Sequence, residues 1–66
     1  MKIHVNGQIM ELEGELTVTE LFVRLEVDAA YRAVAINREV ILKSNYDSTI
    51  VVDGDKVEIV RPVSGG

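Results

Sequence analysis

The 66-residue chain contains no cysteine and only one histidine, His4. Without a thiol it can form no disulfide, no thiolate metal site and no cysteine nucleophile. A lone histidine completes neither a zinc site nor a serine–histidine–aspartate triad, so we expect His4 to be a surface residue. The chain also lacks a glycine-rich phosphate-binding loop, so we expect it to bind no nucleotide itself. These absences argue against an enzyme and predict no bound metal or cofactor.

Basic residues and long apolar runs are also scarce. Seven lysines and arginines stand against eleven acidic residues, which gives a net charge of −4. This balance is unsuited to binding nucleic acid or anionic membranes. No apolar run approaches the roughly 18 residues that a membrane span requires. The alternating start, Met1–Val5, has no signal-peptide core. We therefore expect a cytoplasmic protein that binds neither nucleic acid nor membrane.

The length of the chain bounds its architecture. Sixty-six residues suffice for one domain only. A domain of this size buries about 60% of the surface that its unfolded chain exposes, so its core is thin. We predict a single domain over residues 1–66 that acts through its surface, with a flexible tail at 62–66. We expect it to be a monomer on its own.

The first thirteen residues predict a β-hairpin. Asn6-Gly7 suits a type I′ turn, in which both central residues need positive φ. This turn sets Val5 opposite Gln8, and alternation then places the apolar side chains of both strands on one face.

A helix is predicted next, because residues 17–20 form a capping box with Thr17 at the N-cap and Glu20 at the third helical position. One apolar stripe at helical spacing follows, consisting of Val18, Leu21, Phe22 and Leu25. We expect the helix to end between Glu26 and Asp28.

Short strands are predicted over the rest of the chain. They are residues 33–36, 39–42, 49–52 and 56–61, separated by polar turns. A hairpin, a helix and then several short strands indicate an α+β protein of the β-grasp (ubiquitin-like) type. It has a mixed sheet of four to five strands with one main helix packed across one face.

Asp53-Gly54-Asp55 invites comparison with the start of a calcium-binding loop. An EF-hand loop needs a glutamate at its twelfth position, where this chain has Ser64. We therefore interpret the segment as a turn and predict no metal site.

The sequence ends in Gly65 and Gly66, which is its most informative motif. Glycine has no Cβ, so such a tail can enter a narrow enzyme groove. Its terminal carboxylate is ionised at neutral pH and is a group that ATP can activate. The alternative is an incidental flexible end, because glycine is common in disordered termini.

A docking surface is predicted beside this tail. Ile9, Ala35 and Val60 are expected on the face of the sheet away from the core, and Arg61 follows the last strand. If their strands are neighbours, these residues form an apolar patch with a cation next to the tail. The alternatives are scattered aliphatic side chains, which are normal on monomers, and a solvated arginine.

The sequence resembles the bacterial sulfur carrier proteins of thiamine biosynthesis. The residues that carry the resemblance are Val34–Asn37, Lys43–Tyr46, Asp53–Val60 and Pro62–Gly66, and Val5–Gly7 and Thr17–Val18 also fit. The likeness thus covers nearly the whole chain. Departures are Ser64, where a third glycine is frequent, Tyr46, where tryptophan is common, and Leu42, where proline is common.

The resemblance implies a protein co-substrate and not an enzyme. An E1-like adenylating enzyme would bind the domain and use ATP to activate the carboxylate of Gly66. A cysteine desulfurase or sulfurtransferase would supply sulfur, and thiazole synthase would take it from the resulting thiocarboxylate. Gly66 is then the sulfur-carrying residue, and Gly65, Ser64 and Val63 form the tail that enters the enzyme.

Other functions are compatible with the sequence. The small subunit of molybdopterin synthase is another thiocarboxylate carrier on this fold, although it is typically longer, with two prolines before the diglycine. Further sulfur-transfer pathways and the tagging of lysines are also open. An alternative of a different class is a non-covalent ubiquitin-like interaction module, in which Gly66 would be dispensable.

Overall fold

The structure, a computed structural model, describes residues 1–29 and 32–61. The tail predicted at 62–66 lies outside these residues. The elements are β1 (Lys2–Val5), β2 (Gln8–Glu11), β3 (Leu16–Thr17), α1 (Val18–Leu25), β4 (Ala33–Ile36), β5 (Glu39–Ile41), the 3₁₀ turn η2 (Lys43–Asn45), β6 (Ile50–Val51) and β7 (Lys56–Val60). Among the described residues, no helix has the length and apolar character needed to cross a membrane.

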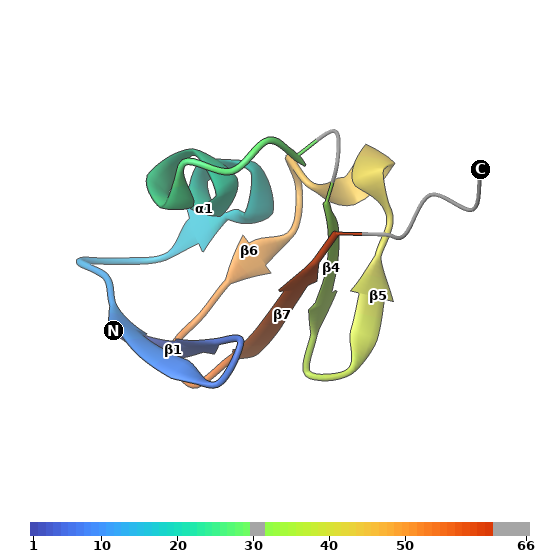
Figure 1. The fold of residues 1–66 in the computed structure, drawn as a ribbon. Helices are drawn as coiled ribbons and strands as arrows, with labels where there is room; N and C mark the ends of the chain where they lie inside the picture. Colours follow the sequence, from blue (N-terminus) through green and yellow to red (C-terminus); the bar gives the residue numbers. More distant parts are fainter. Residues whose placement is uncertain (30–31, 62–66) are drawn as a thin grey trace.

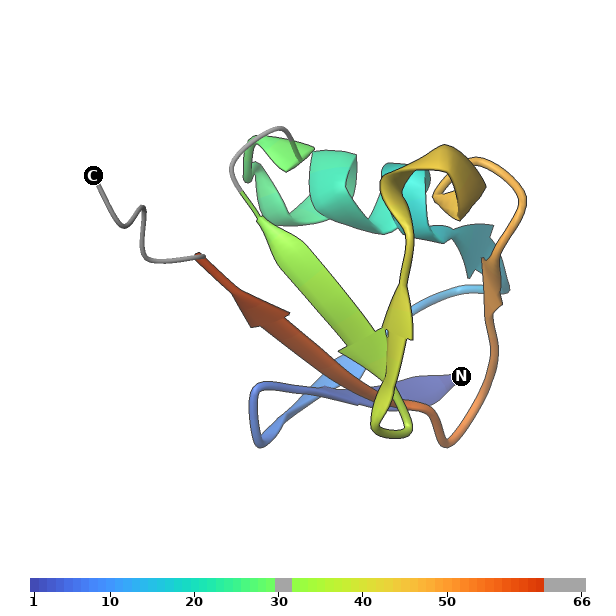
Figure 2. The same ribbon diagram turned by 90° about the vertical axis from the view of Figure 1, so that its right-hand side faces the viewer.

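Five strands form the main sheet in the order β2-β1-β7-β4-β5. The pairing of β1 with β7 is parallel, and the other three pairings are antiparallel. Helix α1 lies across one face of this sheet, and the opposite face is left open (Figures 1 and 2). The predicted mixed sheet with one helix across one face is therefore confirmed.

The β1–β2 hairpin has the register that its turn predicts. Asn6 and Gly7 have φ angles of 50° and 84°, and Val5 pairs with Gln8. The side chain of Asn6 also reaches β7. Its Nδ2 donates to the carbonyl of Ile59 at 3.1 Å, and its Oδ1 accepts the Ile59 N–H at 2.8 Å. The tip of the hairpin is thereby tied to the last strand.

The capping box of α1 forms as predicted. Thr17 Oγ1 accepts the Glu20 N–H at 3.1 Å, and the Thr17 N–H donates to Glu20 Oε1 at 2.9 Å. These two bonds satisfy donors that the start of a helix leaves unpaired. The helix ends at Leu25, and Glu26 adopts a left-handed conformation with a φ of 58°.

One strand was not expected from the sequence. Leu16–Thr17 pairs with Ile50–Val51 to form a separate two-stranded sheet, β3-β6. The segment predicted as a strand at 49–52 thus exists as β6, but its partner is β3 and not the main sheet. Thr17 is both the last residue of β3 and the N-cap of α1, so the small sheet fixes the start of the helix.

The core lies between α1 and the sheet. Phe22 is 2% exposed, and its ring centroid lies 5.4 Å from that of Tyr46. Burial raises the pKa of Tyr46 above its ordinary value of 10.0, although a backbone hydrogen bond with Val34 acts in the opposite direction. The Tyr46 hydroxyl is therefore neutral at physiological pH, and it donates to the carbonyl of Arg32 at 3.4 Å.

Asp55 is a buried charged residue, 9% exposed. Its Oδ2 accepts the Val52 N–H at 2.9 Å, and its Oδ1 accepts Asn37 Nδ2 at 3.0 Å. Asn37 Oδ1 in turn accepts the Lys56 N–H at 3.0 Å. Together with Gly54, whose φ is 87°, these contacts show that Asp53-Gly54-Asp55 is a turn. This turn joins the entry of β7 to the β4–β5 hairpin.

Phe22→Ala is expected to lower the free energy of unfolding by about 3–5 kcal/mol, because it leaves a cavity at the centre of the core. Urea denaturation followed by circular dichroism measures the change. The control is Val23→Ala on the same helix, where the side chain is 73% exposed and the expected change is within about 0.5 kcal/mol. Similar losses in both variants would contradict this assignment of the core.

Asp55→Ala is expected to lower the free energy of unfolding by about 1–3 kcal/mol, because the Val52 N–H and the Asn37 amide lose their acceptor. Glu58→Ala is the control, since Glu58 is an exposed acidic residue on β7. Both variants are measured by urea denaturation at neutral pH. An unchanged midpoint for Asp55→Ala would show that this turn does not depend on the carboxylate.

Candidate functional site

The residues that the sequence assigns to the chemistry, Gly66 and the preceding Gly65, Ser64 and Val63, lie outside the described residues. The strand that leads to them is described in full: β7 ends at Val60, and Arg61 follows it as an exposed residue. The part of the site that lies within the described residues is therefore the surface around the end of β7.

Five apolar side chains lie on the open face of the sheet at this end. We call them the sheet-end patch; they are Ala33, Ala35, Val40, Leu42 and Val60. Strand β4 lies between β7 and β5, and the registers set Ala33 opposite Val60 and Ala35 opposite Val40. Leu42 continues the extended backbone of β5, so alternation carries its side chain to the same face as Val40.

The sheet-end patch is both exposed and hollowed. The exposed fractions are 70% for Val40, 64% for Leu42 and 54% for Val60. Between the valines, the small side chains of β4 leave a shallow hollow of 130 Å³, which Glu58 also lines. Large aliphatic side chains around a floor of alanine form a surface on which an apolar side chain of a partner can pack.

The alternation of β4 explains why this surface is open. Val34 and Ile36 point into the core and are 2% and 8% exposed. Ala33 and Ala35 consequently point to the other face, which no helix covers (Figure 2). The same strand thus supplies the core and the floor of the patch.

Ile9 lies on the same face but outside the sheet-end patch. It is on β2, and β1 separates β2 from β7. Ile9 pairs with His4, which pairs with Lys56 at the beginning of β7, whereas Val60 is at its end. The structure therefore brings Ala35, Val60 and Arg61 to one end of the sheet and leaves Ile9 at the outer strand, 65% exposed.

Sequence reasoning missed three members of the patch, which are Ala33, Val40 and Leu42. A signal for Val40 was present in the two-residue loop Asn37-Arg38, whose φ angles are 52° and 70°. Such a loop fixes Ile36 opposite Glu39, and hence Ala35 opposite Val40.

The chemistry available to the described residues is limited. Within 1–29 and 32–61, no group of three or more histidine, cysteine, aspartate or glutamate side chains is arranged to hold a metal ion. His4 is exposed on β1, in the strand pair next to Lys56. What the described surface offers is an apolar contact area beside the strand that leads to Gly66.

Comparison with known proteins places the chain in a family. Residues 3–66 match the ThiS family. The chain is 33% identical to the sulfur carrier protein ThiS of Escherichia coli, and the match covers all of both proteins. It is also 41% identical to a thiazole synthase of Paramagnetospirillum magneticum over all 66 residues. A thiazole synthase of Magnetococcus marinus is 30% identical over the same length. The chain spans 20% of each of these two synthases.

Solved structures agree with the sequence matches. The crystal structure of the thiamine biosynthesis protein ThiS from Geobacter metallireducens is 40% identical, with a TM-score of 0.91 and full coverage of both chains. A solution structure of the thiamine biosynthesis protein from the same organism superposes with a TM-score of 0.79, covering all of this chain and 88% of the other. By sequence and by fold, this chain belongs to the ThiS family, the sulfur carriers of thiamine biosynthesis.

Proposed function

We propose that this chain carries sulfur as a thiocarboxylate on Gly66. The observation that supports this most directly is the match to the Escherichia coli sulfur carrier over the whole of both proteins. The family match extends to residue 66 and so includes the diglycine. A carboxylate can carry sulfur without any cysteine, which agrees with the composition of the chain.

The chemistry begins at the carboxylate of Gly66 in the active site of an E1-like adenylating enzyme. A carboxylate oxygen attacks the α-phosphorus of ATP, the bond to the β-phosphate breaks, and pyrophosphate leaves. The terminal sulfur of a persulfide on a cysteine desulfurase or sulfurtransferase then attacks the acyl carbon, and AMP leaves. A second thiol of the partner enzymes attacks the enzyme-side sulfur of the resulting acyl disulfide, which releases the thiocarboxylate and leaves a disulfide on the partner. ATP belongs to the partner enzyme, and this chain itself binds no cofactor. Gly65 and Gly66 keep the approach to the reacting carbon narrow because neither has a Cβ.

Geometry supports the sheet-end patch as the docking surface for this step. Five residues separate Arg61 from the end of the sequence, and five extended residues span at most about 18 Å. An enzyme that holds Gly66 at its reacting atoms therefore also meets the end of β7. The apolar side chains of the patch lie there, and Arg61 adds a cation beside them.

Thiazole synthase is the proposed acceptor of the sulfur. Two proteins of that name contain a segment similar to the whole of this chain, as one fifth of their length. Such an arrangement supports a carrier and a synthase that act on each other. The carrier itself acts as a cytoplasmic monomer between encounters. The small subunit of molybdopterin synthase, another thiocarboxylate carrier on this fold, is the alternative.

Removal of Gly66 is expected to abolish thiocarboxylate formation, because the shortened tail no longer places a carboxylate at the α-phosphorus of ATP. The assay incubates the protein with an adenylating enzyme, ATP, a persulfide donor and a thiol reductant, and records its intact mass. Wild-type protein gains the mass difference between sulfur and oxygen. Ser64→Gly is the matched control in the tail and should gain it too. A mass gain in the protein without Gly66 would contradict the assignment of the sulfur to that residue, and the absence of a gain in the wild-type protein would favour a non-covalent interaction module.

Val60→Glu is expected to raise the KM of the adenylating enzyme for the carrier by about tenfold or more, since it places an unpaired carboxylate in the apolar contact. Ile9→Glu is the matched control on the same face, outside the sheet-end patch, and should leave KM unchanged. Circular dichroism confirms that both variants fold. An equal effect of the two variants on KM would contradict a docking surface limited to the sheet-end patch and would indicate that the whole open face contacts the enzyme.

A further inference from the structure

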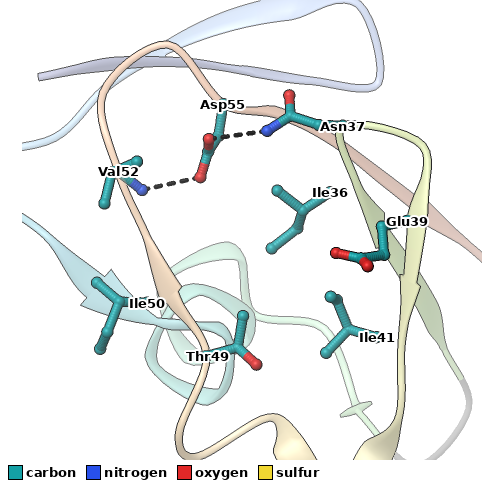
Figure 3. Close-up of a pocket in the computed structure, with 8 residues that line it drawn as sticks. All are labelled: Ile36, Asn37, Glu39, Ile41, Thr49, Ile50, Val52 and Asp55. Carbon is teal, nitrogen blue, oxygen red and sulfur yellow. Dashed lines mark hydrogen bonds between the residues drawn. The ribbon is translucent and has the colours of Figure 1, made fainter.

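A second concavity lies on the other side of β5. The side chains of this strand alternate, so that Val40 joins the sheet-end patch while Glu39 and Ile41 line a pocket of 510 Å³ between β5 and β6. Figure 3 shows its side chains arranged around a common space. The strand β5 is the last in the sheet order, so the pocket opens at a free edge of the sheet.

Half of the residues that line this β5–β6 pocket are aliphatic. Ile36 and Ile41 come from β4 and β5, and Ile50 and Val52 come from the segment of β6. Ile50 and Val52 are 48% and 38% exposed, whereas Ile36 is 8% exposed. The pocket therefore has a buried aliphatic floor and a partly exposed aliphatic side. Its volume lies within the range of small-ligand pockets and exceeds that of one side chain.

Two carboxylates line this pocket, and they differ in their partners. Asp55 is engaged by the Val52 N–H and by Asn37. The side chain of Glu39 has no hydrogen bond or ion pair with any residue in 1–29 or 32–61. Figure 3 shows its carboxylate turned from β5 into the space between Ile36 and Ile41. Glu39 is exposed, so its carboxylate is open to a cation of a partner, with the modest attraction of a partly exposed ion pair.

We propose that the β5–β6 pocket receives an arginine side chain of a partner protein. The planar guanidinium can donate two parallel hydrogen bonds to the Glu39 carboxylate. The alkyl stem of the arginine would lie along Ile41 and Ile50 while its charged end stays at the acidic rim. The net charge of −4 adds attraction for a basic partner.

The position of the pocket agrees with an occupant from a protein. It lies on the reverse side of the same edge strand that bears Val40 of the sheet-end patch. A partner seated on the patch can therefore reach around the free edge of β5 and insert one side chain. The pocket itself does not depend on sulfur carriage, so failure of the thiocarboxylate assay would leave this inference intact.

The test uses N-acetyl-arginine amide as the probe and N-acetyl-citrulline amide as its uncharged isostere. Methyl-resolved NMR of the isotope-labelled protein follows the isoleucine and valine methyl groups during titration. The arginine probe is expected to shift the methyl signals of Ile36, Ile41, Ile50 and Val52. We expect it to bind about threefold or more tightly than the citrulline probe, as for a partly exposed ion pair.

Matched variants assign the preference to one carboxylate. Glu39→Gln should make the two probes bind equally, while Glu58→Gln removes the same charge on the other face of the sheet and should preserve the preference. Equal binding of the probes to the wild-type protein, or methyl shifts located elsewhere, would overturn the proposal. Loss of the preference in Glu58→Gln as well would also overturn it, because the attraction would then be a diffuse effect of net charge.

Discussion

The central place of β7 is the constraint on which the rest of the structure depends. It is the last strand in sequence and the middle strand of the sheet, with β1 parallel on one side and β4 antiparallel on the other. Without it, the β1–β2 and β4–β5 hairpins share no hydrogen bonds in the sheet. The domain therefore closes only when the end of the chain is inserted between them, which makes its decisive contacts long-range.

Two polar residues in turns secure that insertion. Asp55 connects the entry of β7 to Asn37 in the β4–β5 hairpin. Asn6 connects the tip of the β1–β2 hairpin to Ile59 farther along β7. Asn6 uses both the donor and the acceptor of its side-chain amide. Asp55 uses both oxygens of its carboxylate. In a domain with so thin a core, hydrogen bonds between turns that are distant in sequence help to set the order of the strands.

The local parts of the fold could be predicted from sequence, and the long-range parts could not. The turn at Asn6-Gly7 and the capping box at Thr17 follow rules that involve only neighbouring residues, so the register of the hairpin and the start of the helix were predicted correctly. The strand β3 consists of two residues and has no periodicity to detect. The separation of Ile9 from Val60 follows from β1 lying between β2 and β7, which no local pattern encodes. The β5–β6 pocket is lined by residues from 36–41 and 49–55, and the strands β5 and β6 within these segments do not pair. From sequence alone, Glu39 is an ordinary surface charge.

The hydrogen bonds between the Asn6 side chain and the backbone of Ile59 have a mechanical consequence. A pull on the chain beyond Arg61 acts along β7, and the hydrogen bonds to β1 and β4 run across that direction. A pull along β7 therefore loads these bonds together, in shear. The bonds of an edge strand that is pulled away sideways would instead break one at a time. The amide of Asn6 adds two more bonds at Ile59, close to the end where the load enters. The pairings of β7 with β1 and β4 thus resist, as a group, a force applied along the strand from the Arg61 end.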